Sequence, residues 1–565
     1  MAVEIGGPAV AGDNSSAVEQ VKPYKIHVSS RYLNLTKQKL EISRLPHETD
    51  EPKSKDWWQP KSQVEPLIDF WLEEHQWRDE EETLNRLPQF RTGFKLPQSQ
   101  SPIRIQFIHA RSSHSNVIPL LLIPPFPVSS LSLGHLIKLF TDPSEANQQP
   151  FHVVIPSLPG LGFSDALPTN SPVISSTADI LDSLMKRLGY PFYLATTTGA
   201  GASSPAHIDY RLAEWLSTQY PKSCLGTHFI SPPLTKPRLR TAPLAWAKWS
   251  VAGFFESSAL GYHSKDFSAL RQGGGETARR SAMAAKLSSN SSNFAEPNTL
   301  AYALCDSPTG LLVFVMKGLR LLAPHKEFTP AEIINFTQLA WLPGPEAAMR
   351  FWAHCARHPE TPGKKPPKKP HVALTVFLGD EQKAAPQSND NANEDASVYV
   401  DVAKPPYSCP AWADTRYNVL HTNRASGSPG FLAWERPDII AAGVRGLSAA
   451  VLKVDKRLQP SANPEVTAAQ RQDVALEPEI TSPITPMDQP SALGSPLIPP
   501  KSGLLAPPNV GERLAPVREI SDDTKVASHE TLPSKTPSPG PATPSPVSSG
   551  PPLAVTPPPE GNAKE

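Results

Sequence analysis

A run of small residues, "ATTTGAGAS" at positions 195–203, has the pattern of a turn that carries a catalytic nucleophile. It continues the apolar strand pattern "PFYLA" and leads towards a helical pattern, and in one large class of enzymes such a turn exposes the nucleophile. The apex here reads glycine, at Gly199, and glycine has no side chain with which to attack a substrate. Thr198 is an alternative nucleophile, because a threonine hydroxyl can attack when a base lies beside it.

The segments around this turn alternate between strand and helix patterns. Strands are expected in "IRIQFIHARS", "VIPLLLIPPF", "FHVVIPSLPG", "PFYLATTTG" and "CLGTHFISPP", and helices in "SSTADILDSLMKRLGY" and "DYRLAEWLSTQYP". A purely helical block follows, before strands return in "HVALTVFLGD" and "RYNVLHT" and a last helix in "RPDIIAAGVRGLSAAVL". This order predicts an α/β fold with a mostly parallel, doubly wound sheet and an inserted helical lid.

The region before these strands has a pattern of its own. "KPYKIHVSS" is expected as a short strand and "RYLNLTKQKLEISRL" has helical spacing, while residues 62–77 are expected as one amphipathic helix. The predicted divisions are a disordered N-terminus 1–20, an N-terminal domain with the first core strands 21–130, a first core part 131–235, the lid 236–358, a second core part 359–454 and a disordered tail 455–565.

The chain's 66 prolines are spread unevenly and are densest in the C-terminal tail, which is also rich in serine and threonine and has no apolar periodicity. Such a segment cannot bury enough apolar surface to offset the entropy of ordering, so disorder is predicted. Its Ser-Pro and Thr-Pro steps are candidate phosphorylation sites or protein-binding motifs. The alternative is a solvated tail without a partner.

Charge and cysteine content argue against several classes of function. Lysine plus arginine equals aspartate plus glutamate, at 54 each, so no nucleic acid partner is expected. The four cysteines are far apart and lack metal-ligand spacing, which predicts reduced thiols in a cytoplasmic protein. We expect no metal or other cofactor. The most apolar run, "NVIPLLLIPPFPV", is too short and proline-broken to span a membrane, although peripheral membrane attachment stays open.

Several stretches together resemble the microsomal-type epoxide hydrolases. "YKIHVSSRYLNLTKQKLEISRLP" and "HQWRDEEETLNRLPQFRTGF" are similar to that family's N-terminal arm, "FHVVIPSLPGLGFSDA" to a core strand and loop, and "WLPGPEAAMRFW" and "FLAWERPDII" to lid and C-terminal segments. The resemblance implies an α/β-hydrolase fold with an N-terminal arm. It also implies a reaction in which an aspartate attacks an epoxide carbon, and a histidine held by a second carboxylate activates water to hydrolyse the ester.

At the nucleophile and base positions the chain departs from this family. The family pattern G-G-D-W-G at the turn places Gly199 where the aspartate stands, with Ala200 as a backbone donor of the oxyanion hole. The family pattern G-G-H-F, aligned on Phe431, places Gly430 where the histidine stands. His421 on the expected last strand is an alternative base, and the other interpretation is a satisfied histidine at a strand end.

The remaining family positions are partly kept. "LTVFLGD" places Asp380 at the acid, with Glu381 as the neighbouring alternative, although a solvated loop aspartate would read the same. The two lid tyrosines correspond to Trp352 and, by spacing, to Ser289. The oxyanion loop reads "PPFP", in which the backbone N–H of Phe126 can still donate while the prolines cannot.

A catalytic triad acts as a unit, and losing the nucleophile alone removes most of its catalysis. We therefore predict an epoxide hydrolase-like protein that has lost the family reaction, a pseudoenzyme. It would bind a small apolar ligand beneath the lid, near Trp341, Phe351 and Trp352, or bind a protein through its tail, and a homodimer stays open. The alternative is an active epoxide hydrolase, or another hydrolase, that converts epoxides into diols at a relocated site.

Overall fold

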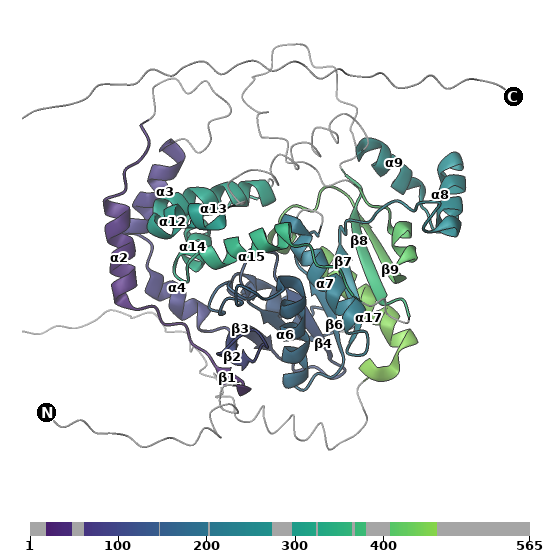
Figure 1. Ribbon diagram of the computed structural model, residues 1–565, viewed down its shortest axis with the longest axis horizontal. Helices are drawn as coiled ribbons and strands as arrows, with labels where there is room; N and C mark the ends of the chain where they lie inside the picture. Colours follow the sequence, from purple (N-terminus) through teal and green to yellow (C-terminus); the bar gives the residue numbers. More distant parts are fainter. Residues whose placement is uncertain are drawn as a thin grey trace, which may run out of the picture. The chain divides into compact units, whose positions relative to one another are not determined.

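A nine-stranded sheet forms the centre of the computed structural model, which describes residues 19–47, 61–145, 147–201, 204–273, 296–323, 326–363, 368–379 and 407–459 (Figure 1). The strands, in sheet order, are β1 (Lys22–Pro23), β2 (Gln89–Phe94), β3 (Ile103–Ala110), β5 (Phe151–Pro156), β4 (Ile118–Ile123), β6 (Tyr193–Thr197), β7 (Cys224–Ile230), β8 (His371–Phe377) and β9 (Asn418–Ala425). The first three pairs, from β1 to β5, are antiparallel, and the pairs from β5 to β9 are parallel. The predicted mostly parallel α/β sheet is confirmed.

Alternate residues of the central strands face two separate cores. The helices that cover the sheet are α5 (Ile137–Thr141), α6 (Val173–Arg187), α7 (Ile208–Gln219) and α17 (Pro437–Val454). Leu121 and Ile123 of β4 pack in one core with α6 and α7, while Leu120 and Leu122 pack in the other with α5 and α17. All four side chains are fully buried, which explains why β4 is a continuous apolar run.

The N-terminal arm differs from prediction in three places. Its helices are α2 (Ser30–Glu41), α3 (Lys61–Glu73) and α4 (Trp77–Leu84). The strand expected from residue 22 to 30 is only two residues long, because the chain leaves the ladder before α2, whose N-cap is Ser29. The helix expected over 62–77 ends at Glu73, and α4 begins at Trp77. β2, "QFRTGF", has no clear apolar alternation and was not predicted.

The predicted helical block between β7 and β8 forms two groups. Its helices are α8 (Pro243–Phe255), α9 (Ser264–Gly273), α12 (Pro297–Asp306), α13 (Pro308–Leu322), α14 (Pro330–Trp341) and α15 (Glu346–Arg357). α13 and α14 pack against α2 and α3 of the arm, and the indole N–H of Trp341 donates to the hydroxyl of Thr36 at 2.8 Å. α8 and α9 lie apart from them, at the other side of the view next to β8 and β9 (Figure 1).

In the part of the chain that the structure describes, no single helix has the length and apolar composition to cross a membrane. One pair of segments, Pro297–Asp306 with Pro308–Arg320, meets those criteria together but is bent by 117°. Of the predicted disordered ends, residues 1–18 and 460–565 lie outside the described residues. The predicted start of the tail is slightly early, because η5 (Lys456–Leu458) follows α17 and buries Leu458.

A buried ion pair attaches the first part of this helical block to the sheet. Asp266 of α9 is fully buried and accepts two hydrogen bonds from the guanidinium of Arg424 on β9, at 2.8 and 2.9 Å. The hydroxyl of Tyr407 donates to the same carboxylate at 2.7 Å. Burial by itself would raise the pKa of Asp266, but the hydrogen bonds from Arg424 and Tyr407 outweigh it and lower the pKa. The carboxylate therefore stays charged and holds three segments together.

We expect the substitution Asp266→Ala to lower the free energy of unfolding by about 2–4 kcal/mol, because it leaves the partly buried guanidinium of Arg424 without its partner. Chemical denaturation of both proteins measures the difference. Glu256→Ala is the matched control, since Glu256 pairs with Arg271 on the exposed surface and should contribute less than about 1 kcal/mol. Equal losses in the two variants would show that Asp266 does not anchor α9.

Candidate active site

The predicted nucleophile turn follows β6 directly and is held by the strands on either side. The backbone N–H and the hydroxyl of Thr198 both donate to the carbonyl of Ile123 on β4, each at 3.0 Å. The N–H of Gly201 donates to the carbonyl of Ile230 on β7 at 2.8 Å. Gly199 at the apex does not adopt a positive φ, so the turn lacks the strained backbone typical of a nucleophile elbow.

The helix after the turn begins later than predicted. α7 starts at Ile208, after the short η2 (Pro205–His207), and residues 202–203 are not described. Ala206 and His207 adopt φ values of 49° and 54°, a left-handed conformation that residues other than glycine rarely take. This left-handed step directs the first turn of α7, which carries Asp209, back towards Gly199.

The carboxylate of Asp209 lies where a side chain on Gly199 would stand. A Cβ atom added to Gly199 would lie 2.4 Å from Oδ2 of Asp209 and 2.8 Å from the Cβ of Pro125. Asp209 is 1% exposed, and its Oδ1 accepts a hydrogen bond of 3.0 Å from the backbone N–H of Phe126. This N–H is the donor that we predicted for the oxyanion hole. A carboxylate from α7 therefore already uses it.

Sequence analysis missed Asp209. The available signal was an aspartate in the first turn of the predicted helix "DYRLAEWLSTQYP", where an acidic side chain is common for helix-capping reasons alone. Nothing in the sequence distinguishes a carboxylate that faces solvent there from one that folds back onto the preceding turn. That distinction depends on the left-handed step before α7, which the pattern does not reveal.

Burial raises the pKa of Asp209 to about 7, and the hydrogen bonds with Phe126 and Ser204 offset only part of this effect. Ser204 also accepts a hydrogen bond from the backbone N–H of Asp209 at 3.2 Å. No cation pairs with the carboxylate among the described residues. The carboxyl group is therefore protonated in the folded protein under mildly acidic conditions, where an exposed aspartate is charged.

The hydroxyl of the alternative nucleophile, Thr198, is engaged within the core. Thr198 is fully buried and its hydroxyl donates to Ile123, as described above. The histidine nearest to it along the chain, His207, has its Nδ1 at 3.3 Å from the carbonyl of Gly201. Within the described residues, no base is hydrogen-bonded to Thr198, so the arrangement that would activate it is missing.

The position predicted for the base is closed as well. Gly430 has a φ of 55°, and a Cβ atom added there would lie 2.1 Å from Oε2 of Glu435. The next residue, Phe431, stacks on Trp434 with ring centroids 3.9 Å apart, and both rings contact Phe336 of α14. This loop is therefore packed against the helical block, and a histidine at position 430 would first have to displace Glu435.

His421, the alternative base, lies away from the turn. It is on β9, three strands along the sheet from β6. A Cβ atom added to Gly446 of α17 would lie 2.3 Å from its Nε2, so the imidazole packs closely against α17. The structure does not bring His421 to Gly199. Asp380, Glu381 and Ser289, the predicted acid positions and lid position, lie outside the described residues.

The lid residues nearest to the oxyanion loop pack against it. Phe351 of α15 is 5% exposed and stacks on Phe126 with ring centroids 5.4 Å apart. Trp352, at a predicted tyrosine position, is half-buried and packs against the apolar core that contains Phe126 and Phe351. Ala200 of the turn belongs to the core on the other face of the sheet. Trp341 is hydrogen-bonded to Thr36 of the arm. The aromatic side chains that we expected around a ligand thus fill space between elements.

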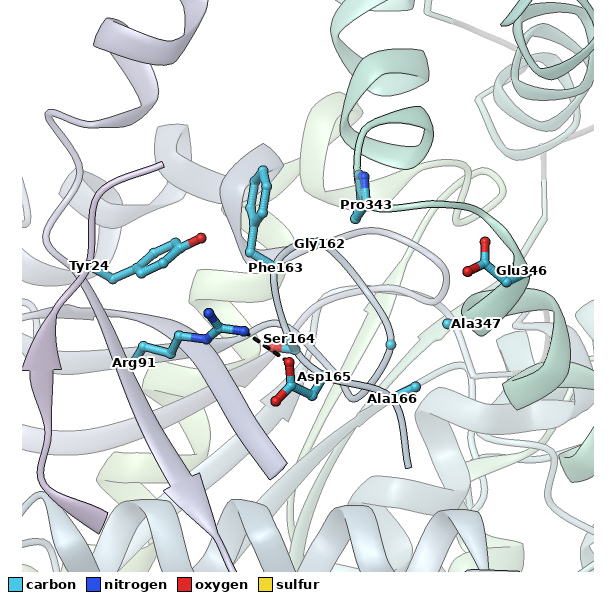
Figure 2. A pocket seen from close by; sticks show the side chains of 11 residues that line it. Tyr24, Arg91, Gly162, Phe163, Ser164, Asp165, Ala166, Pro343, Glu346 and Ala347 are labelled. Carbon is cyan, nitrogen blue, oxygen red and sulfur yellow. Dashed lines mark hydrogen bonds and ion pairs between the residues drawn. The ribbon is translucent and has the colours of Figure 1, made fainter. Parts of the chain in front are cut away.

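Two pockets lie outside this turn. A pocket of about 330 Å³ is formed by Tyr24 and Arg91 of the arm and first strands, the loop 160–166 after β5, and the residues that lead into α15 (Figure 2). In it, Arg91 donates to Asp165 at 3.0 Å. A pocket of about 70 Å³ lies at the ends of β7 and β8, beside Gly379 and Gly427. Neither is lined by Gly199, Asp209 or Gly430.

The described residues contain no group of three or more His, Cys, Asp or Glu side chains arranged to hold a metal ion. The cysteines are free thiols, three of them buried and one, Cys305, exposed.

Comparison with known proteins gives the relationship of this chain. Residues 21–133 match the family model described as "Epoxide hydrolase N terminus". The chain is 29% identical over 336 residues to a putative epoxide hydrolase of Stigmatella aurantiaca, covering 57% of this chain and 66% of that protein. It is 24% identical over 462 residues to epoxide hydrolase 1 of Sus scrofa, covering 78% of this chain and 89% of that protein.

Solved structures agree on the fold. The structure of Aspergillus niger epoxide hydrolase is similar with a TM-score of 0.56 and 18% identity, covering 77% of this chain and 98% of that one. Juvenile hormone epoxide hydrolase from Bombyx mori is similar with a TM-score of 0.55 and 20% identity, covering 77% and 96%. The chain is similar in sequence and in fold to these epoxide hydrolases. The α/β-hydrolase fold that the sequence predicted is confirmed.

Similarity to epoxide hydrolases does not by itself transfer an activity to this chain. The matched part spans 66% of the Stigmatella protein and 59% of juvenile hormone epoxide hydrolase 1 of Ctenocephalides felis, less than two thirds of either. At the turn of this epoxide hydrolase-like chain, the structure brings together Gly199, Pro125, Phe126 and Asp209. It brings neither of the predicted alternatives, an activated Thr198 or His421, to that place.

The raised pKa of Asp209 predicts a distinctive pH dependence of stability. The folded protein holds a proton at this site up to about pH 7, whereas the unfolded chain releases it near pH 4, so stability from this group is present in acid and is lost as the pH rises towards 7. Relative to Asp209→Asn, the wild type should gain about 2–3 kcal/mol between pH 8 and pH 5. Denaturation of both proteins at each pH measures this difference. A difference that does not change with pH would contradict the buried, unpaired carboxyl.

Proposed function

We propose that this epoxide hydrolase-like protein is a non-catalytic binding scaffold. The observation that carries the proposal is the place of the Asp209 carboxylate, beside Gly199 and on the backbone N–H of Phe126. The family reaction needs a nucleophile that can reach an epoxide and amide donors that are free to stabilise the tetrahedral intermediate. Here the turn has no side chain at its apex, and the donor on the loop is bonded to a carboxyl group.

The closed packing above the turn supports the same proposal. Phe351 stacks on Phe126, and Arg211 of α7 donates to the carbonyls of Cys355 and Glu360 at the end of α15, at 3.0 and 3.3 Å. The carboxylate of Glu360 in turn accepts from the backbone N–H groups of Ile174 and Ser175 at the start of α6. The end of α15 is therefore hydrogen-bonded both to α7 and to the start of α6. These bonds disfavour repeated opening of the lid for substrate.

A relocated active site is the second candidate, and one observation favours it. Asp209 is a carboxylate at the position of the missing nucleophile, so it could attack an epoxide carbon, with the epoxide C–O bond breaking and the alkoxide taking a proton from water. With Gly430 at the base position, the resulting ester would lack the histidine that activates water. Such a site would accumulate a stable ester and not turn over.

The experiment is an assay of epoxide hydrolysis by the purified full chain, with styrene oxide and stilbene oxide as substrates. We expect the rate with wild type to equal the rate in buffer, because no described group can complete both steps. Hydrolysis above buffer that Asp209→Asn abolishes would overturn the proposal in favour of the relocated site. Intact-mass analysis after incubation separates the two further, since a single adduct absent from Asp209→Asn would identify Asp209 as a trapped nucleophile.

A matched pair of variants tests whether restoring the two family side chains at positions 199 and 430 is enough to restore hydrolysis. In Gly199→Asp/Gly430→His the new aspartate meets the Asp209 carboxylate, so we expect a less stable protein without activity. In Gly199→Asp/Asp209→Ala/Gly430→His/Glu435→Ala both carboxyl groups that occupy these places are gone and only Pro125 remains close, so we expect measurable hydrolysis. Activity in the first variant but not in the second would contradict the role that we assign to Asp209.

The remaining expectations form part of the same proposal. Such a scaffold would bind a protein through the Ser/Thr-Pro motifs of its tail, or a small apolar ligand beneath the lid if Phe351 moved away from Phe126. It would use neither a nucleic acid nor a cofactor. The four free cysteines support a cytoplasmic location. A homodimer through the arm is a proposal that sedimentation of the full chain would test.

A further inference from the structure

We propose that helix α8, the first helix of the block between β7 and β8, docks this protein onto an anionic lipid surface. The helix would lie in the plane of the membrane. The observation is an apolar surface that faces solvent on a helix whose opposite side is firmly packed. The inference concerns a part of the molecule remote from Gly199 and does not depend on whether the active site is functional.

The exposed apolar residues of the protein gather on and around α8. Of the thirteen large apolar side chains that are exposed in the described residues, seven lie between positions 239 and 260. On α8 itself, Leu244 is 81% exposed, Phe254 82% and Phe255 68%. Soluble surfaces rarely carry a contiguous apolar patch of this kind unless it binds something. We call the outward-facing residues Leu244, Trp246, Val251, Phe254 and Phe255 the α8 patch.

The orientation of α8 is set by its inner face. Trp249 lies between the rings of Tyr262, Phe267 and Trp412, with centroid distances of 5.5, 5.7 and 5.6 Å, and Ala252 is 1% exposed in the same cluster. At a helical spacing of 100° per residue, Leu244, Val251 and Phe254 fall on the side opposite to Trp249 and Ala252. The α8 patch is therefore held outwards by a packed inner face.

Basic residues flank the α8 patch along the chain, and this charge selects the partner. Two of them, Lys236 beside the ring of Trp249 and Lys248 near Asp414, lie toward the packed side. From position 236 to 265 the chain has five basic residues, namely Lys236, Arg238, Arg240, Lys248 and Lys265, and one acidic residue, Glu256, which pairs with Arg271. All five basic residues are exposed. Among the described residues, no carboxylate forms an ion pair with Arg238 or Arg240, which precede the helix. Exposed cations next to exposed apolar side chains favour binding to anionic headgroups, with the apolar side chains entering the acyl layer.

The shape of the α8 patch also favours a membrane over a folded protein partner. The surface is a single helix next to β8 and β9 and apart from α12–α15 (Figure 1), and neither of the two pockets described above is lined by α8. α8 has 13 residues and is about 20 Å long, too short to cross a hydrocarbon layer of about 30 Å. It can therefore lie on a bilayer, with its aromatic side chains at the interface.

The test is flotation of the full chain with vesicles. We expect wild type to float with phosphatidylcholine vesicles that contain about 30% phosphatidylserine, and to float much less with pure phosphatidylcholine or when salt rises from about 0.1 M to about 0.5 M. Leu244→Glu/Phe254→Glu should reduce the bound fraction at least about fivefold, because it places charge on the inserted face. Arg238→Ala/Arg240→Ala should reduce it and also flatten the salt dependence.

The control places the same two charges on other exposed apolar residues, as Ile42→Glu/Val454→Glu, which should float like wild type. Thermal denaturation of each variant checks that the fold is kept. Failure of wild type to float with any vesicle overturns the proposal, as does flotation of Leu244→Glu/Phe254→Glu at the wild-type level. Equal flotation with both vesicle types overturns the selection by anionic lipid. Self-association of wild type that this double variant abolishes, without flotation, would identify the α8 patch as a contact between copies.

Discussion

A buried carboxyl group without a cation, that of Asp209, is the constraint around which the candidate site is built. Taking a carboxylate out of water is costly unless hydrogen bonds or a proton compensate. Here the N–H of Phe126 donates one hydrogen bond to the carboxyl group. Burial raises the pKa of Asp209, so the protonated form is favoured over the buried charge. The loop after β4, the turn after β6 and the start of α7 must therefore keep their relative positions. The left-handed conformations of Ala206 and His207 are a local strain that this arrangement maintains.

This constraint explains why the apex of the turn is glycine. The place of a Cβ atom on Gly199 is taken by Oδ2 of Asp209 on one side and by Pro125 on the other. Glycine at this position is a requirement of close packing and not a loss of one side chain in an otherwise open site. At Gly430 the near atoms belong only to the end of the flexible Glu435 side chain, so the positive φ of 55° favours glycine there more than close packing does. At both positions that we predicted for the nucleophile and the base, a carboxyl group from a following helix lies beside the glycine.

The helical block inserted between β7 and β8 has two physically different halves. Helices α12 to α15 are packed against the arm and the core, and α15 is tied to the starts of α6 and α7 through Glu360 and Arg211. Helix α8 is packed on one face only, through Trp249, and α9 is held by the buried pair of Asp266 and Arg424. One half therefore closes over the core while the other half presents apolar surface outwards. The word lid therefore describes only helices α12 to α15.

The sequence by itself determined the α/β class, the order of the strands and helices, and the absence of side chains at positions 199 and 430. These follow from local information, because hydrophobic periodicity sets each element and residue type sets what each position can do. The two-residue β1 and the unpredicted β2 show the limit of that information, since an irregular or polar strand is recognised only by its pairing with neighbours. Asp209 shows the limit more clearly. A carboxylate in the first turn of a helix reads as an ordinary surface residue, and only the tertiary structure, through the backbone path between β6 and α7, decides that it is buried against Gly199 and bonded to Phe126. In the same way, the apolar composition of α8 is visible in the sequence, but which of its faces is covered depends on Trp412, about 160 residues further along the chain.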